Sequence, residues 1–401
     1  MPYPAPDPKT SFRTRLHRLT CFAFLCLAAG CAGADDEPAG AEPEVGRLVI
    51  VGGALDRGNE GVYRAVLEAR QGEGPFCVLP TASGVPEESM ASAVSAFMEH
   101  GADSVDGVFI STENPDAARD PAIAERLSRC SGFWFVGGVQ SRVVDVFLPG
   151  GAMTPAYDAV MARFREGAVV SGSSAGAAIM SPTMIAGGSS AGALVAGVVT
   201  EEVGEEDPEG VLVEPGMGFH EGAVYDQHFL ARGRIGRLLV ATLAGVGDGV
   251  GFGIDENTAL VVDGTEAWVV GASGVVLVDA REAESSAVGN GGTGLSLYLV
   301  GDGDRIDMQT LEVVPAADKP VLMPGDADVA VPEDPFARWA FLHLLHDLGT
   351  SEASSVDVAV GGYVLSVSEG PAFQARAHAE PGVEGTPRGL SAGPFVVSLV
   401  P

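Results

Sequence analysis

The stretch "AVVSGSSAGAAIM", residues 168–180, decides the fold because it joins a buried strand to a helix through one tight turn. Residues 168–170 form an apolar run typical of a buried strand, and the small residues after Ser174 can begin a helix against a sheet. The central pentapeptide GSSAG, residues 172–176, fits G-x-S-x-G, a turn that exposes a serine hydroxyl. This order of strand, turn and helix predicts an α/β fold.

The same alternation of strand and helix extends upstream. The strand-like runs are 47–53, 76–80, 104–110, 133–138 and 168–172, and the helix-like runs between them are 61–70, 88–101, 121–130 and 154–167. Strands separated by helices favour right-handed crossovers, and therefore a mostly parallel sheet with helices on both faces. Ligands of such sheets bind at the carboxyl ends of the strands. We therefore expect the chemistry of the protein at that edge.

The sequence pattern changes after Phe252, where glycine-rich, strand-like runs follow one another at 258–264, 267–280, 294–300 and 303–315. Without long helices between them, they predict antiparallel strands along the edge of the first sheet. Residues 335–349 predict a late amphipathic helix. We expect a catalytic domain over residues 47–310 and a β-rich C-terminal extension of unknown role over residues 311–401.

The charge of the chain restricts its partners. The 401 residues include 54 acidic and 23 basic ones, giving a net charge of -31 and a pI near 4.4. Binding to nucleic acid is not expected, because contact with phosphates requires a basic face. A cationic substrate would be attracted to this surface. Solubility, or adaptation to salt, explains the same charge equally well.

The N-terminus is typical of an exported protein. Residues 1–30 combine a basic start with an apolar run too short to span a bilayer, which predicts a signal peptide. The sequence before Cys31 is similar to a lipobox, so we expect lipidation of Cys31, with a plain secretion signal as the alternative. Residues 31–46 predict a disordered acidic linker. Cys77 and Cys130 can pair in an oxidising compartment or lie separately in the core.

GSSAG occurs a second time, at residues 188–192, so the chain has two candidate nucleophiles. Ser190 in this second copy follows "IAGG" and has no evident strand behind it, which indicates a loop. Ser174 has a strand before it and a helix after it. Its neighbours Gly172 and Gly176 leave room where a Cβ would collide with the strained turn. We therefore predict that Ser174 is the nucleophile.

A serine hydroxyl needs a base to take its proton and an acid to orient that base. His228 follows a short apolar strand in "VYDQHFLARGRIGRL", and Glu256 follows another in "GFGIDENTAL". His220 is the competing base, although it lies in a glycine-rich run without a strand end behind it. The order serine, histidine, acid differs from the serine, acid, histidine order of α/β-hydrolases, which argues against a lipase or esterase.

Three arginines, Arg232, Arg234 and Arg237, follow His228 within nine residues in a chain with few basic groups. Clustered guanidinium groups can grip the carboxylates of a substrate in a bidentate manner. The alternative is a helix face whose arginines balance the acidic side chains of the protein itself.

Five segments together resemble the cyanophycinases and, more widely, the serine peptidases that include aspartyl dipeptidase: "VLPTAS" 78–83, "FVGGVQ" 135–140, "SGSSAGAAIM" 171–180, "DQHFLARGRIGRL" 226–238 and "GIDENTAL" 253–260. The arginine-rich segment distinguishes cyanophycinases from the dipeptidases. The resemblance implies a class I glutamine-amidotransferase-like three-layer α/β sandwich. It also implies hydrolysis of cyanophycin, a poly-aspartate whose side chains carry arginine, to β-Asp-Arg dipeptides, without a metal or another cofactor.

The resemblance assigns roles to residues of this chain. It makes Ser174 the nucleophile, His228 the general base and Glu256 the orienting acid, with the backbone N–H groups of Gly138 and Ala175 as oxyanion donors. It also implies that six residues hold substrate: Gln140, Asp226, Gln227, Arg232, Arg234 and Arg237. Val139 departs from the asparagine that the family pattern leads us to expect.

Two other functions stay open at this point. One is an aspartyl dipeptidase-like peptidase that acts on short peptides. The other is a surface lipoprotein that binds polymer without cleaving it. The oligomeric state is also open, with a homodimer among the options. His343 and His346 have an i, i+3 spacing that metal ligands can use, but no partner ligand is evident, so we expect a solvated helix face.

Overall fold

The computed structural model describes residues 45–200, 209–326, 328–377 and 390–401. The predicted signal peptide, the expected lipidation at Cys31 and residues 31–44 of the predicted linker lie outside these ranges. In the described ranges, no helix has the length and apolar character required to cross a membrane.

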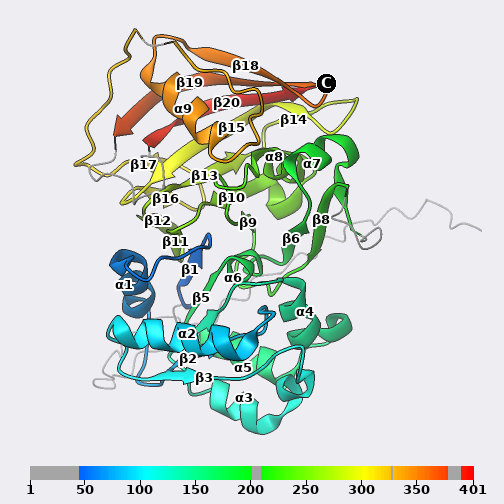
Figure 1. The fold of residues 1–401 in the computed structure, drawn as a ribbon, viewed down its shortest axis with the longest axis vertical. Helices are drawn as coiled ribbons and strands as arrows, with labels where there is room; N and C mark the ends of the chain where they lie inside the picture. The colour runs from blue at the N-terminus through cyan, green and yellow to red at the C-terminus, as the bar shows by residue number, and fades with distance from the viewer. Residues whose placement is uncertain (1–44, 201–208, 327, 378–389) are drawn as a thin grey trace, which may run out of the picture. The chain divides into compact units, whose positions relative to one another are not determined.

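The first large sheet has nine strands, which come from residues 48–173 and 258–314. Figure 1 shows these strands in the lower and middle parts of the view. The parallel half of this sheet has the order β1 (Leu48–Val51), β5 (Val169–Ser173), β4 (Gly132–Phe135), β2 (Phe76–Leu79) and β3 (Val105–Gly107). Its other half pairs with β1 in antiparallel fashion through β11 (Thr258–Asp263), β12 (Glu266–Gly271), β16 (Arg305–Asp307) and β17 (Val313–Val314). The α/β prediction is thus confirmed, but only half of this sheet is parallel.

Helices pack on both faces of the parallel half, because its strands are apolar on both sides. Leu48 and Ile50 of β1 belong to one core with residues of α3 (Pro121–Leu127), α4 (Ser141–Phe147) and α5 (Pro155–Arg165). The alternate residues, Val49 and Val51, belong to a second core with α1 (Glu60–Glu68) and α2 (Pro86–Glu99). The described chain also has three short 3₁₀ helices, η1 (Pro115–Arg119), η2 (Pro149–Gly151) and η3 (Val246–Gly249).

A second sheet of eight strands follows the order β18 (Ser355–Val360), β19 (Tyr363–Ala377), β20 (Leu390–Val400), β15 (Gly292–Gly301), β13 (Gly274–Asp279), β10 (Val250–Ile254) and β9 (Val224–Asp226), with β14 (Glu284–Ser285) paired to β15. Of these neighbours, β9 and β10 are parallel. A third core joins this sheet to α7 (Ser190–Ala196), α8 (Ile235–Leu243) and α9 (Ala340–Thr350). A small sheet of β6 (Thr183–Gly187), β8 (Val211–Pro215) and β7 (Val198–Val199) completes the described strands.

The strands predicted after Phe252 divide between the two large sheets. β11, β12, β16 and β17 extend the first sheet as antiparallel strands, as the lack of long helices between them predicts. β13 and β15 instead pair in the second sheet, where β15 also pairs with β20 from the predicted extension. The boundary at residue 310 stays a prediction, and strand pairing crosses it.

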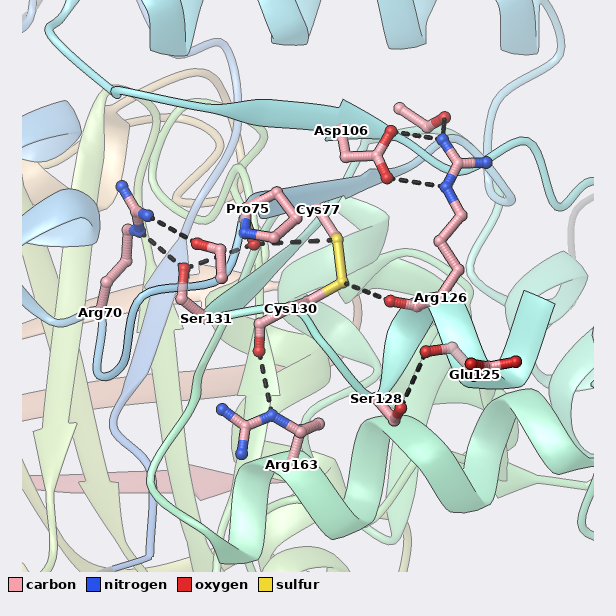
Figure 2. The surroundings of a disulfide bond; sticks show 12 residues. Arg70, Pro75, Cys77, Asp106, Glu125, Arg126, Ser128, Cys130, Ser131 and Arg163 are labelled. Atoms are coloured by element: carbon pink, nitrogen blue, oxygen red, sulfur yellow. Dashed lines mark hydrogen bonds and ion pairs between the residues drawn. A yellow bond between two sulfur atoms is a disulfide. The ribbon is translucent and has the colours of Figure 1, made fainter. Parts of the chain in front are cut away.

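Cys77 on β2 and Cys130 after α3 form a disulfide with a Cα–Cα distance of 5.9 Å. The two cysteines are fully buried, and their pairing chooses between the alternatives that the sequence left open. The carbonyl of Cys130 accepts from Nε of Arg163 at 3.0 Å. Figure 2 shows this contact beside the disulfide, together with the pair of Arg126 and Asp106. The bond thus joins the parallel sheet to the loop after α3.

Candidate active site

The candidate site lies where the carboxyl ends of four strands from the two large sheets meet. Ser174 follows β5, and Gly52 and Gly53 follow the neighbouring β1 of the first sheet. His228 follows β9 by two residues, and Glu256 follows β10 by two residues in the second sheet. The candidate residues thus lie at strand carboxyl ends, and the second sheet supplies two of the side chains.

Ser174 occupies a strained turn. Its φ and ψ are 56° and -110°, a conformation that L residues rarely adopt, and its N–H donates to the carbonyl of Val51 at 3.0 Å. A Cβ on Gly172 would lie 2.6 Å from the carbonyl oxygen of Gly176, and one on Gly176 would lie 2.2 Å from that of Phe135. A side chain at either position would clash with the backbone, so both positions require glycine, as the G-x-S-x-G pattern predicts.

His228 reaches Ser174 from the second sheet. Its Nε2 lies 3.0 Å from Ser174 Oγ, and its Nδ1 lies 2.6 Å from Oε1 of Glu256. Its backbone also has a positive φ of 46°, fixed by donation of its N–H to the carbonyl of Gly52 at 2.7 Å. A Cβ on Gly53 would lie 2.4 Å from the imidazole, so glycine is required there as well. The structure thus brings hydroxyl, imidazole and carboxylate into one chain of hydrogen bonds.

The protonation of this chain suits a general base. Burial lowers the pKa of His228, and the hydrogen bond that His228 donates to Glu256 opposes this shift by raising the pKa. Nearby Arg232 lowers the pKa of His228 further through charge repulsion. With the proton of the neutral ring on Nδ1, held by Glu256, the lone pair of Nε2 faces the hydroxyl of Ser174. The imidazole can therefore take the hydroxyl proton near neutral pH.

Gly138 and Ala175 present backbone N–H groups beside the hydroxyl. In the described part of the chain, neither N–H donates to a backbone or side-chain acceptor. Gly138 has a φ of 147°, and a Cβ there would lie 2.0 Å from the carbonyl oxygen of Ala82. The position of Val139, where the family pattern differs, is held by its own N–H, which donates to that same carbonyl at 2.9 Å. Two available donors are what an oxyanion hole needs.

The second GSSAG copy has a different structure. Ser190 does follow a strand, β6, contrary to the prediction of a loop, and it begins helix α7. Its hydroxyl is buried and donates to the carbonyl of Gly233 at 2.6 Å, while it accepts from the N–H of Arg237 at 3.3 Å. Ser190 therefore holds the arginine-bearing loop in place, and no histidine is bonded to it.

The arginines and Asp226 divide into buried and accessible groups. Arg237 and Asp226 are 3% and 1% exposed and form a bidentate ion pair, in which Nε of Arg237 lies 2.7 Å from Oδ2 of Asp226. These two predicted substrate ligands therefore bind each other. A buried charge needs such a partner. Arg234 donates to the carbonyl of Gln227 at 2.6 Å, and burial lowers its pKa to about 10. Arg232 is exposed and has no ion-pair partner among the described residues.

The two glutamines also differ. Gln227 is close to the nucleophile, since its Oε1 lies 3.3 Å from Ser174 Oγ. The amide nitrogen of Gln140 instead donates to the carbonyls of Ile185 and Ala186, at 3.0 and 2.8 Å. Gln140 therefore ties the loop after β4 to β6, which leaves its oxygen as the group that can face a ligand.

A hollow of about 430 Å³ adjoins the turn at Ser174. It is lined by Ser173, which precedes Ser174, by Gly137, and by the exposed Glu88. Arg57 also lines it, but both carboxylate oxygens of Glu99 lie 2.8 Å from its Nη1. Of the two charged residues that line the hollow, Arg57 has an ion-pair partner, and Glu88 has none in the described chain.

Three contributions to the site were not predicted from the sequence. Gly52 and Gly53 support the imidazole, and a strand followed by two glycines was the signal for them. Asp255 is fully buried and accepts from the N–H of Ala231 and from Ser273, which fixes the segment after the histidine. Trp339, from the predicted C-terminal extension, donates its indole N–H to Asp255 at 3.3 Å. No local pattern marks that contact.

The competing histidines lie elsewhere. His220 is bonded through Nδ1 to the hydroxyl of Tyr225 at 2.7 Å, and burial lowers its pKa. His343 and His346 lie on α9, with His343 exposed. In residues 45–401, apart from the gaps given above, no cluster of three or more histidine, cysteine or acidic side chains is arranged to hold a metal.

Comparison with known proteins identifies the family of this chain. The model of Peptidase family S51 matches residues 48–270, which include Ser174, His228 and Glu256. Cyanophycinases of Trichormus variabilis and Geminocystis herdmanii are each 30% identical to this chain, over 67% and 66% of its length and 88% and 94% of theirs. A solved peptidase from an acI-B1 Actinobacterium is 17% identical, with a TM-score of 0.43, and covers 66% of this chain and 98% of its own. This chain belongs to peptidase family S51 and is a serine-type peptidase.

Proposed function

We propose that this protein is an exported cyanophycinase that cleaves cyanophycin to β-Asp-Arg dipeptides with a Ser174-His228-Glu256 triad. The observation that carries the proposal is the continuous hydrogen-bond chain from hydroxyl to imidazole to carboxylate. The 30% identity to cyanophycinases supports the choice of substrate.

In the proposed mechanism, Ser174 Oγ attacks the carbonyl carbon while His228 Nε2 takes its proton. The carbonyl oxygen becomes an oxyanion and accepts hydrogen bonds from the N–H groups of Gly138 and Ala175. His228 then gives the proton to the leaving nitrogen as the C–N bond breaks, which leaves an acyl-enzyme. Water attacks this ester, its proton passes to His228, and the proton returns to Ser174 as the acid product departs.

Charge supports a substrate that carries arginine. The net charge of -31 favours contact with the guanidinium groups of such a polymer. In the hollow beside Ser174, Glu88 can pair with a guanidinium. Exposed Arg232 can pair with the free α-carboxylate of an arginine unit of the polymer. A substrate with alternating acid and guanidinium groups matches both.

Export is supported by the disulfide between Cys77 and Cys130, because disulfides persist in oxidising compartments. We therefore propose that residues 1–30 are removed as a signal peptide and that Cys31 carries lipid at the cell envelope. The polymer would then be degraded outside the cytoplasm.

We also propose that the fold is the class I glutamine-amidotransferase-like sandwich, with the catalytic domain over residues 47–310. The supporting feature is the parallel order β1-β5-β4-β2-β3 between two helical layers. A homodimer stays a prediction.

The deciding experiment is incubation of the mature chain with purified cyanophycin, followed by mass analysis of the soluble products. We expect β-Asp-Arg as the main product. An α-aspartyl dipeptide serves as the comparison substrate. Release from the dipeptide without release from the polymer would show the dipeptidase-like activity, and binding of the polymer without any product would show the non-catalytic alternative.

A further inference from the structure

The segment before α9 reaches the candidate site although it lies beyond residue 270, where the family match ends. Within it, the backbone N–H of Trp339 donates to the carbonyl of Leu230 at 2.9 Å. A Cβ on Gly233 would lie 1.7 Å from the carbonyl oxygen of Phe336. The segment 336–339 thus lies in direct contact with the loop that begins at His228.

The side chain of Trp339 acts on a buried carboxylate. Its Nε1 donates to Oδ2 of Asp255 at 3.3 Å, while Oδ1 of the same carboxylate accepts from the N–H of Ala231 at 2.8 Å. Asp255 is fully buried and has no ion-pair partner among the described residues, so neutral donors alone hold it. Asp255 precedes Glu256, and Ala231 lies three residues after His228, so this carboxylate joins the backbones of both.

Arg338 acts on the other carboxylate. Its guanidinium lies 4.1 Å from the centre of the Trp339 ring, and one of its nitrogens lies 3.9 Å from Oε2 of Glu256. The other oxygen of Glu256, Oε1, is the one bonded to His228. The cation therefore faces the free side of the carboxylate that orients the imidazole.

We propose that Trp339 and Arg338 are positioning residues of the active site, which act through the adjacent carboxylates Asp255 and Glu256. The segment 336–339 is then a working part of the catalytic machinery. This inference rests on the proposed triad, because the two carboxylates matter to catalysis through His228.

The test measures the rate at which a fluorophosphonate labels Ser174, which requires the triad but no cyanophycin. Trp339→Phe keeps the ring and removes the N–H donor, and we expect labelling to slow about tenfold. Trp268→Phe is the matched control, since Trp268 also lies under an arginine, Arg305, at 5.7 Å. That control is expected to label at the wild-type rate.

Arg338→Ala and Arg305→Ala form the second pair, because the two arginine side chains are 63% and 62% exposed and each faces a glutamate. We expect slower labelling in Arg338→Ala alone, with recovery in Arg338→Lys and weakening of the difference at high salt. With substrate, kcat should fall while KM stays near the wild-type value.

The pH profile separates positioning from general destabilisation. Burial raises the pKa of Asp255, and the donors around it, including Trp339, hold that rise in check. Loss of the indole N–H should therefore raise the pKa of Asp255 further. As the pH is lowered, the labelling of Ser174 in Trp339→Phe should fall off at a higher pH than in the wild-type protein. In an Asp255→Asn background, the same tryptophan substitution should add little, because its partner charge is gone.

Wild-type labelling rates and pH profiles in both Trp339→Phe and Arg338→Ala would overturn this inference and leave the triad intact. A wild-type protein that the reagent does not label would instead overturn the triad, and this inference with it. Unfolding temperatures identify variants that are slow because they are unfolded.

Discussion

The duplicated GSSAG pentapeptide permits a direct test of the nucleophile, because Ser174→Ala and Ser190→Ala remove the same atom from the same local sequence. Ser174 Oγ lies 3.0 Å from His228 Nε2, whereas Ser190 Oγ donates to the carbonyl of Gly233 at 2.6 Å. Ser174→Ala should lower kcat by about 10⁴-fold or more, since no acyl-enzyme can form. At ~1.4 kcal/mol per tenfold, this is a loss of more than ~5 kcal/mol of transition-state stabilisation.

Ser190→Ala should act on stability instead. It removes two hydrogen bonds, to the carbonyl of Gly233 and from the N–H of Arg237, in a buried place. At ~1 kcal/mol for each bond, the free energy of unfolding should fall by ~2 kcal/mol, which corresponds to a few degrees in Tm. Because Gly233 lies in the arginine-bearing loop, we expect a loss of activity of less than about tenfold.

The assay is release of soluble dipeptide from cyanophycin under saturating conditions, together with phosphonate labelling followed by mass mapping of the labelled peptide. Thermal unfolding of both variants shows that each is folded at the assay temperature. Full hydrolysis by Ser174→Ala, combined with loss of hydrolysis in Ser190→Ala, would refute the assignment. Label on the peptide that contains Ser190 would refute it as well.

Three further predictions concern charge and covalent structure. Arg232 lowers the pKa of His228, so Arg232→Ala should raise it and move the acid limb of the pH–kcat/KM profile to higher pH; an unchanged limb would contradict the proximity of the two groups. Asp226→Asn leaves the buried guanidinium of Arg237 without its counter-charge and should cost about 3–5 kcal/mol in denaturant unfolding, whereas a cost below ~1 kcal/mol would contradict a structural role. Cys77→Ser opens a loop with a sequence separation of 53 residues and should destabilise the protein by ~4 kcal/mol on chain entropy; chemical reduction of the wild-type protein should reproduce this loss.

The parallel half of the first sheet could be predicted because its strands are apolar on both faces and helical patterns separate them. Val49 and Val51 face one core, and Leu48 and Ile50 face the other. The run 48–51 is therefore apolar on both faces, which is typical of a strand buried between two layers. The contact of Ser174 with His228 could be predicted for a related reason, since Ser174 directly follows a buried strand whose carboxyl end faces the candidate site.

The division of later strands between two sheets could not be predicted. Runs such as 274–279 and 258–263 are equally apolar, and pairing partners depend on tertiary contacts that no short pattern specifies. The ion pair between Asp226 and Arg237 could not be predicted for a similar reason. An acid and an arginine eleven residues apart look like two ligands for substrate, and only burial reveals that they bind each other.

The contact from Trp339 to Asp255 had no sequence signal because 84 residues separate the two side chains. The helix expected from residue 335 begins instead at Ala340, after Trp339 adopts a φ of 55°. That backbone reversal lets the indole N–H reach the carboxylate. Helix propensity alone favours a helix that begins near residue 335, but the contact between Trp339 and Asp255 overrides it.

Strand β20 hydrogen-bonds to β19 on one side and to β15 on the other. It therefore lies in the same sheet as β10, the strand that leads into Asp255 and Glu256. A variant without residues 390–400 would leave β15 with one neighbour fewer, although the first sheet and the turn at Ser174 would keep all their strands. The integrity of the serine turn and the placement of its two partner side chains thus depend on separate sheets.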